Sequence, residues 1–142
     1  MDVLIENQSG IPVELSALKL LAKFVLGEEE AGRDSEVSIA LVDKDAMKAL
    51  NLKFRAFDKP TDVLAFDLGD DGELSGEVVI SPQVAAEQAA ETGTGEFEEV
   101  QRLLIHGLLH LLGYSHERDE DADKMFDKQE MLRQAFIDGG SV

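Results

Sequence analysis

The sequence predicts an α+β fold, with a small mixed sheet of about four strands packed with about five helices. Residues 35–42 alternate between apolar and polar side chains, which is typical of a half-buried strand. Residues 13–29 instead repeat apolar side chains at helical spacing. A length of 142 residues suits one compact domain, and we expect it to span residues 1–142.

The first half of the chain contains the signals of alternating strands and helices. Residues 2–6 are predicted to form a short strand that precedes the helix over 13–29. After the strand at 35–42, Asp43 is a suitable N-cap for a short amphipathic helix. The segment 54–61 is polar and contains a proline, so we predict a loop there.

The second half begins with a predicted strand pair. Residues 62–66 and 77–80 are predicted strands, joined by a loop over 67–76 that is rich in glycine and aspartate. Ser81 followed by a proline is a typical helix start, because the serine caps the helix and proline tolerates the first helical position. A helix over 82–91 is therefore expected.

Two further helices complete the prediction. Thr94 is expected to cap a helix that runs to Gly113, where a glycine in the left-handed conformation would end it. Acidic residues in its first turn would interact favourably with the positive end of the helix dipole. A last helix is predicted over residues 120–137.

Composition restricts the chemistry and the partners. The chain has no cysteine, so any metal must be held by His, Asp or Glu. A net charge of −17 repels nucleic acid and anionic membranes, and we expect neither a membrane nor a DNA partner. The sequence shows no signal peptide and no apolar run of roughly 20 residues that could cross a bilayer. A cytoplasmic protein is therefore expected.

All three histidines of the chain fall within eleven residues, 106–116. His106 and His110 are four residues apart on a helix, so their imidazoles share one face, and every other residue of 103–112 except Gly107 is Leu or Ile. A glycine at 113 allows the chain to turn back, and His116 could then supply a third ligand. Three protein ligands leave one coordination position open, as in catalytic rather than structural zinc sites.

The same histidine spacing occurs on zinc-peptidase helices, but there a glutamate follows the first histidine as general base. Gly107 occupies that position here, which argues against peptide hydrolysis. Glu117 next to His116 could be a substitute base, although a plain surface role fits so acidic a chain better.

A basic segment interrupts this acidic sequence. Residues 44–59 contain five of the thirteen basic residues and two acidic ones, a local net charge of +3. Arg55, predicted to lie in a loop, could bind a phosphate through two hydrogen bonds and stabilise negative charge that develops on it. Next to a metal site, this cluster favours a phosphodiester substrate.

Two segments make the chain similar to the YbeY family of endoribonucleases and rRNA maturation factors. Residues 106–116 (HGLLHLLGYSH) resemble the family signature H-G-x-L-H-L-x-G-Y-D-H. Residues 51–64 (NLKFRAFDKPTDVL) resemble its N-x-x-F-R-x-x-D-x-P-T-D-V-L stretch. Three positions depart from the pattern: Ser115 replaces the usual Asp, Asp67 a usual Pro, and Glu77 a common Asp. The first departure weakens the expected support of a neighbouring ligand.

The resemblance implies one zinc ion on His106, His110 and His116, and a phosphate-facing, catalytic Arg55. It further implies cleavage of single-stranded RNA, maturation of the 3′ end of 16S rRNA, and a role in ribosome quality control. The expected partners are rRNA and the small ribosomal subunit or its proteins. Two alternatives stay open at this point: a non-catalytic ribosome-assembly factor with a structural metal, and a zinc metallopeptidase.

Overall fold

The computed structural model describes residues 1–69, 74–115 and 118–140, and within them the strands form one mixed sheet. Its strand order is β1-β2-β4-β3. β1, β2 and β4 pair in parallel, and β3 pairs antiparallel with β4 at the edge. The strands are β1 (Asp2–Asn7), β2 (Glu36–Leu41), β3 (Val63–Asp67) and β4 (Ser75–Ile80). The predicted mixed sheet is thus confirmed.

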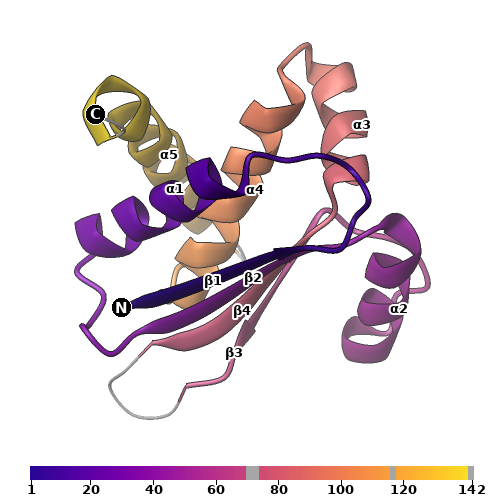
Figure 1. The fold of residues 1–142 in the computed structure, drawn as a ribbon, viewed down its shortest axis with the longest axis horizontal. Coiled ribbons are helices and arrows are strands. Elements are labelled where there is room, and N and C mark those ends of the chain that lie inside the picture. The colour runs from indigo at the N-terminus through magenta and orange to yellow at the C-terminus, as the bar shows by residue number, and fades with distance from the viewer. Residues whose placement is uncertain (70–73, 116–117, 141–142) are drawn as a thin grey trace.

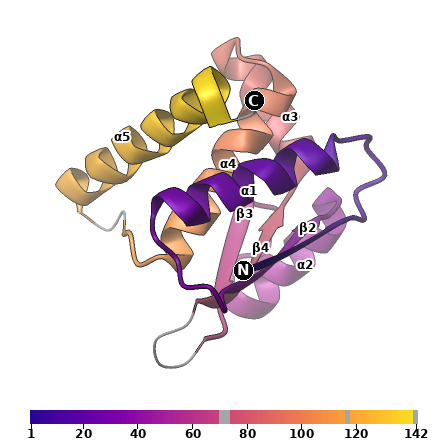
Figure 2. The ribbon, with the colours of Figure 1, turned by 60° about the vertical axis from the view of Figure 1, so that its left-hand side comes forward.

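The described residues form five α-helices, as the sequence predicts, and a terminal π-helical turn, η1. In Figures 1 and 2, α2 lies on one side of the sheet, whereas α1, α4 and α5 lie on the other. None of the helices in the described ranges is both long and apolar enough to span a membrane. The elements are α1 (Leu15–Glu28), α2 (Lys44–Arg55), α3 (Pro82–Thr92), α4 (Glu96–Leu111), α5 (Asp119–Ala135) and η1 (Phe136–Gly140).

The alternation of side chains along the strands divides the core into two parts. Val78 and Ile80 of β4 belong to the main cluster, which also contains the buried leucines of α1 and α4. Val79, between them, belongs to a smaller cluster with Met47 of α2. Because successive side chains of a strand point to opposite faces, one strand sequence supplies both sides of the sheet.

The predicted N-caps are confirmed for two helices and wrong for one. The Asp43 carboxylate accepts from the Ala46 N–H at 2.8 Å, and the Ser81 hydroxyl accepts from the backbone at the start of α3. α4, however, begins after Gly95 rather than Thr94 and has no side-chain cap. The Thr94 hydroxyl instead pairs with the Thr92 hydroxyl at 3.1 Å, because the turn between α3 and α4 brings the two together.

The predicted loop over 54–61 begins later than expected, because α2 continues to Arg55. Lys53 and Arg55 fall in the last turn, where cations interact favourably with the negative end of the helix dipole. Ala56 then ends the helix in the left-handed conformation, with φ of 61°, and its N–H donates to the Leu52 carbonyl. Arg55 is therefore a helical residue and not a loop residue.

Gly107 allows α4 to lie unusually close to the sheet. A Cβ at this position would be 2.6 Å from Val78 Cγ1 and 3.3 Å from Val63 Cγ2. Both neighbours are β-branched and cannot easily rotate away. The position that carries glutamate in zinc peptidases thus has no room for any side chain, and this geometry argues further against the peptidase alternative.

We expect Gly107→Ala to destabilise the fold relative to a matched control, Gly27→Ala in α1, where a Cβ would meet nothing within 4 Å. Both variants gain helix propensity of about 1 kcal/mol, but only Gly107→Ala overpacks the core, at a cost of roughly 1–3 kcal/mol. Urea denaturation would measure the difference. Equal midpoints for the two variants would contradict the close approach.

Candidate functional site

A pocket of about 250 Å³ opens where the end of α2, the segment leading into β3, and α4 meet. The basic end of α2 contributes Arg55, and α4 contributes the two histidines of its buried face. The full lining is Arg55, Thr61, Asp62, Val63, Leu64, Ala65, His106, Gly107 and His110. Folding therefore brings three of the four predicted site residues to one cavity.

The histidine pair has the geometry that its spacing predicts. The ring centroids of His106 and His110 are 5.0 Å apart, with an angle of 76° between the ring planes. Both histidines are partly exposed, whereas the Leu and Ile residues around them on α4 are buried. His116 and Glu117 lie outside the described residues, and within the described ranges no group of three potential metal ligands is found. The third ligand thus stays a prediction.

The turn after α4 is anchored by contacts that involve the end of α1 and α5. Gly113 has φ of +101°, as predicted, and the Tyr114 N–H donates to the Leu109 carbonyl at 3.0 Å. The Tyr114 hydroxyl donates at 2.5 Å to Glu29, the C-cap residue of α1, and Lys128 of α5 pairs with the same carboxylate at 3.1 Å. The hydrogen bond to Glu29, with burial, raises the pKa of Tyr114 to about 12, so the phenol stays protonated at neutral pH.

Gln129 of α5 is a site residue that the sequence analysis missed. It is buried, with 8% of its surface exposed, and its side-chain oxygen lies 3.3 Å from His106 Nδ1. When His106 carries its proton on Nδ1, that nitrogen donates to Gln129 and Nε2 holds the lone pair. A fixed partner on one ring nitrogen is how proteins orient histidines that bind metals.

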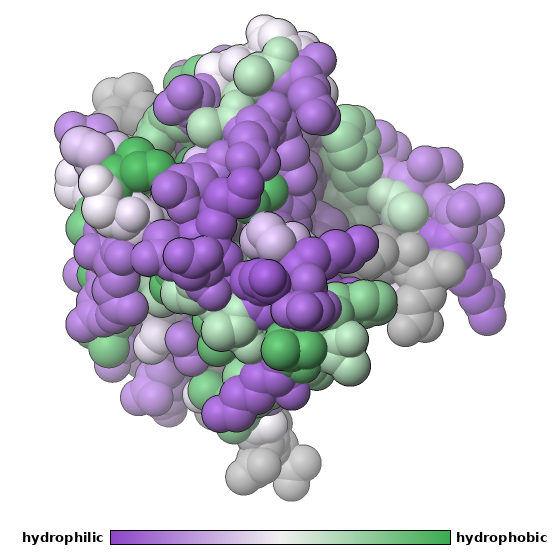
Figure 3. All heavy atoms as spheres, turned by 90° about the vertical axis from the view of Figure 1, so that its right-hand side faces the viewer, coloured by the Kyte–Doolittle hydropathy of each residue, from purple (hydrophilic) through white to green (hydrophobic). Residues whose placement is uncertain are grey.

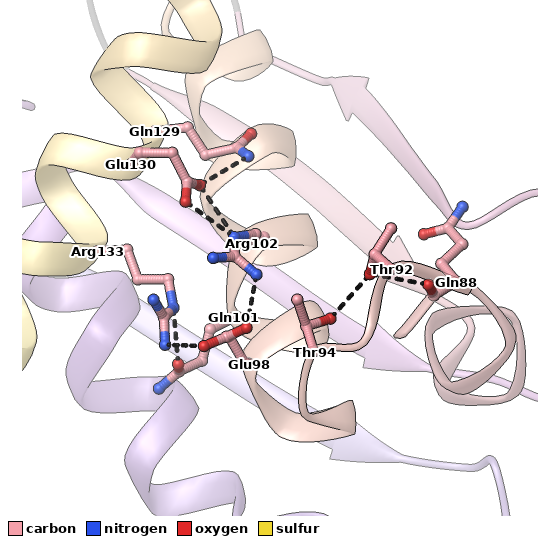
Figure 4. A network of polar contacts seen from close by, with 9 residues as sticks. All are labelled: Gln88, Thr92, Thr94, Glu98, Gln101, Arg102, Gln129, Glu130 and Arg133. Carbon is pink, nitrogen blue, oxygen red and sulfur yellow. Dashed lines mark hydrogen bonds and ion pairs between the residues drawn. The ribbon is translucent and has the colours of Figure 1, made fainter. Parts of the chain in front are cut away.

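A charged network anchors α5 against α4 behind this glutamine, and Figure 4 shows it in detail. Arg102 of α4 donates from Nε to both oxygens of Glu130 at 3.0 Å, and from Nη1 to Glu98 at 2.9 Å. Arg133 of α5 returns to Glu98 at 3.1 Å. The hydrogen bond from Arg102 lowers the pKa of Glu98, so this carboxylate stays charged. The Gln129 amide nitrogen donates to Glu130 at 3.4 Å, which joins this glutamine to the network.

Asp62 is a second residue that the sequence analysis did not assign. Its carboxylate accepts from the Val63 N–H at 2.7 Å and from Gln88 of α3 at 3.1 Å. Asp62 belongs to the quoted P-T-D-V-L segment, which was the available signal. Asp62 lines the pocket and is held there by Gln88 of α3, a contact that the spacing of residues in the sequence does not reveal.

Arg55 presents its charge to solvent at the pocket mouth. The residue is exposed, and its guanidinium lies 5.7 Å from the centroid of the Phe57 ring. Nearby, Lys44 pairs with Glu87 and Lys48 with Asp58. In the described part of the chain, no carboxylate forms an ion pair with Arg55, so its donors can face an anion.

Comparison with known protein families identifies relatives over most of the chain. A family model described as "Endoribonuclease YbeY" matches residues 4–136. A protein named Endoribonuclease YbeY from Carboxydothermus hydrogenoformans is 44% identical over 132 residues, covering 91% of this chain and 92% of the relative. One of the same name from Salinispora tropica is 37% identical over 147 residues, covering 93% and 94%.

A solved structure shares the fold. The solution structure of TM1509 from Thermotoga maritima superposes with a TM-score of 0.66 at 31% sequence identity. The match covers 99% of this chain and 95% of that one.

Proposed function

This chain belongs to the YbeY endoribonuclease family, and from that premise we propose that it is a metal-dependent endoribonuclease specific for single-stranded RNA. Its substrate would be the 3′ end of 16S rRNA, in maturation and ribosome quality control. Its partners would be rRNA and the small ribosomal subunit or its proteins, in the cytoplasm. The family supports the endoribonuclease activity, and the rRNA target and the metal are the parts to be tested.

One observation carries the proposal: an exposed arginine and a histidine pair line the same pocket. Arg55 comes from α2, whereas His106 and His110 come from α4. A guanidinium can donate two hydrogen bonds to the negatively charged non-bridging oxygens of a phosphodiester, and the histidine pair can supply nitrogen ligands to a metal ion at the same phosphate. No such pairing would be needed for a peptide bond, and Gly107 excludes a glutamate base beside His106.

The residues present fit a zinc ion. His106 and His110 would hold it together with His116, and neutral imidazoles are ordinary zinc ligands. With its Nδ1 proton donated to Gln129, His106 would offer the lone pair of Nε2 to such an ion. When bound, zinc would supply Lewis-acid chemistry, lowering the pKa of a water towards ~7 and polarising a phosphoryl oxygen.

The chain's own residues would then position the phosphate. Arg55 would bind the non-bridging oxygens and stabilise the charge that builds up on them in the transition state. Asp62, held by Val63 and Gln88, would form part of the pocket wall. Either a water or the 2′-hydroxyl of the RNA would serve as the nucleophile, and these two routes give different product ends.

Metal removal is the direct test. We expect the purified protein to cleave a single-stranded oligoribonucleotide, to lose this activity on chelation, and to regain it with added zinc. Elemental analysis should find about one zinc ion per chain before chelation, as the three-histidine site predicts. The matched RNA duplex and casein should both resist cleavage. Undiminished RNA cleavage by protein that contains no metal would refute the metal dependence.

The same assay distinguishes the two nucleophiles. A single 2′-deoxy nucleotide at the cleavage position leaves attack by water intact but removes the 2′-hydroxyl route entirely. Loss of cleavage at that position, together with cyclic phosphate ends on the normal product, would assign the 2′-hydroxyl. Casein hydrolysis that depends on metal would instead restore the peptidase alternative.

A further inference from the structure

The loop that follows α2 exposes an aromatic ring in contact with Arg55, which lines the pocket. Phe57 keeps 50% of its surface exposed, two residues after Arg55. The side of the molecule that carries α2 has apolar residues interspersed among hydrophilic ones, as Figure 3 shows. Phe54 is exposed to a similar extent, but its ring packs edge-on against Phe66 at 5.0 Å and so has a structural role. The described structure gives Phe57 no aromatic partner of this kind.

Two cations accompany the Phe57 ring. Both lie over the ring in cation–π contacts, with the Arg55 guanidinium 5.7 Å and the Lys59 ammonium 6.0 Å from its centroid. The nearest acidic residue in sequence, Asp58, lies 3.8 Å from the Lys48 ammonium, which offsets its charge. Half of the Phe57 surface stays exposed despite these two cations. An exposed ring that carries cations is complementary to a nucleotide, because the base can stack on the ring while its phosphates meet the positive charge. In a chain of net charge −17 this local arrangement favours nucleic acid over a cationic or neutral partner.

The backbone on both sides of the ring is held in place. Ala56 turns the chain through the left-handed conformation, and the Phe57 N–H donates to the Asn51 carbonyl at 3.4 Å. The Asn51 side chain is buried and donates to the Lys59 carbonyl at 2.8 Å. Both ends of the short loop are thus fixed to α2. A platform that is ordered before binding loses less conformational entropy when a base stacks on it.

We propose that Phe57 is a base-stacking platform for an unpaired nucleotide next to the phosphate bound by Arg55. This inference rests on the proposed ribonuclease function and adds a binding subsite to it. A base in a duplex already stacks on both neighbours and cannot reach the ring without being displaced. Phe57 would therefore contribute to the preference for single-stranded RNA, with little preference for base identity.

The test compares Phe57→Ala with Phe57→Leu and Phe57→Trp in steady-state cleavage of a single-stranded oligoribonucleotide. Loss of one base–aromatic stack should raise KM roughly 5- to 150-fold while kcat is retained. Leucine should behave like alanine, and tryptophan should restore the wild-type KM. Leu20→Ala is the matched control, since Leu20 of α1 is 56% exposed and is not among the residues that line the pocket. It should leave both constants unchanged.

An abasic substrate provides a second arm that does not depend on the variants folding well. A single abasic nucleotide, moved along the RNA, should raise the wild-type KM by the same factor at one position only. At that position it should cost Phe57→Ala nothing more, because the stack is already absent. If the wild-type protein cleaves RNA and Phe57→Ala has the same KM, the stacking role of Phe57 is overturned but the ribonuclease function is not. Wild-type protein that cleaves no RNA would overturn both.

Discussion

His110→Ala is expected to reduce RNA cleavage by a factor of roughly 10³ or more, because a Lewis acid supplies several kcal/mol of transition-state stabilisation. The variant removes one of two imidazoles whose centroids lie 5.0 Å apart in the pocket. Bound zinc should fall in parallel, which elemental analysis of the purified variant would measure.

The fold should survive this change. His110 is partly exposed, and α4 is held to the sheet by fully buried neighbours such as Leu108 and Leu109. Circular dichroism and thermal unfolding of His110→Ala would confirm that a lost activity is not a lost fold. If the variant is folded and rRNA maturation continues in cells that carry it, the histidines have a structural role, and the assembly-factor alternative is correct.

Arg55→Ala should lower kcat/KM by roughly 10²–10³-fold, the usual effect of removing a positioned donor to developing charge. Zinc content should not change, since Arg55 belongs to α2 and the histidines to α4. Arg55→Lys should recover only part of the activity, because a lysine keeps the charge but cannot form two parallel hydrogen bonds to a phosphate.

Lys53→Ala is the matched control for Arg55→Ala. Lys53 also lies in the last turn of α2 and also has an aromatic neighbour, with its ammonium 5.3 Å from the Phe54 ring centroid, but it does not line the pocket. We expect a small, salt-sensitive effect from this control. A loss as large as that of Arg55→Ala would mean that the segment acts through its overall charge and not through one positioned guanidinium.

Local sequence signals predicted most of the fold correctly. The alternation at 35–42, the apolar spacing at 13–29 and the Ser81 cap each depend on residues close in the chain, and each is confirmed. The errors lie at element ends. The sequence predicts Thr94 as a cap where Gly95 precedes the helix, and it predicts a loop at Arg55 where α2 continues, because several residue types tolerate either side of a helix boundary.

The two missed site residues have a different explanation. Gln129 has no motif around it and Asp62 has only the P-T-D-V-L segment, and their contacts are with residues 23 and 26 positions away. No spacing rule connects such positions, because the contact arises from how α5 packs on α4 and how α3 packs beside β3. Composition and motif therefore could not have selected Gln129 among the polar residues of α5.

From its residues alone, this chain specified its elements and the shared face of His106 and His110, since a helix places positions four apart on one side whatever surrounds it. Packing was needed to bring Arg55 to those histidines, to place Gln129 behind His106, and to leave no space beside Gly107. These are relations between separate elements, and they arise when strands and helices bury their apolar faces against one another.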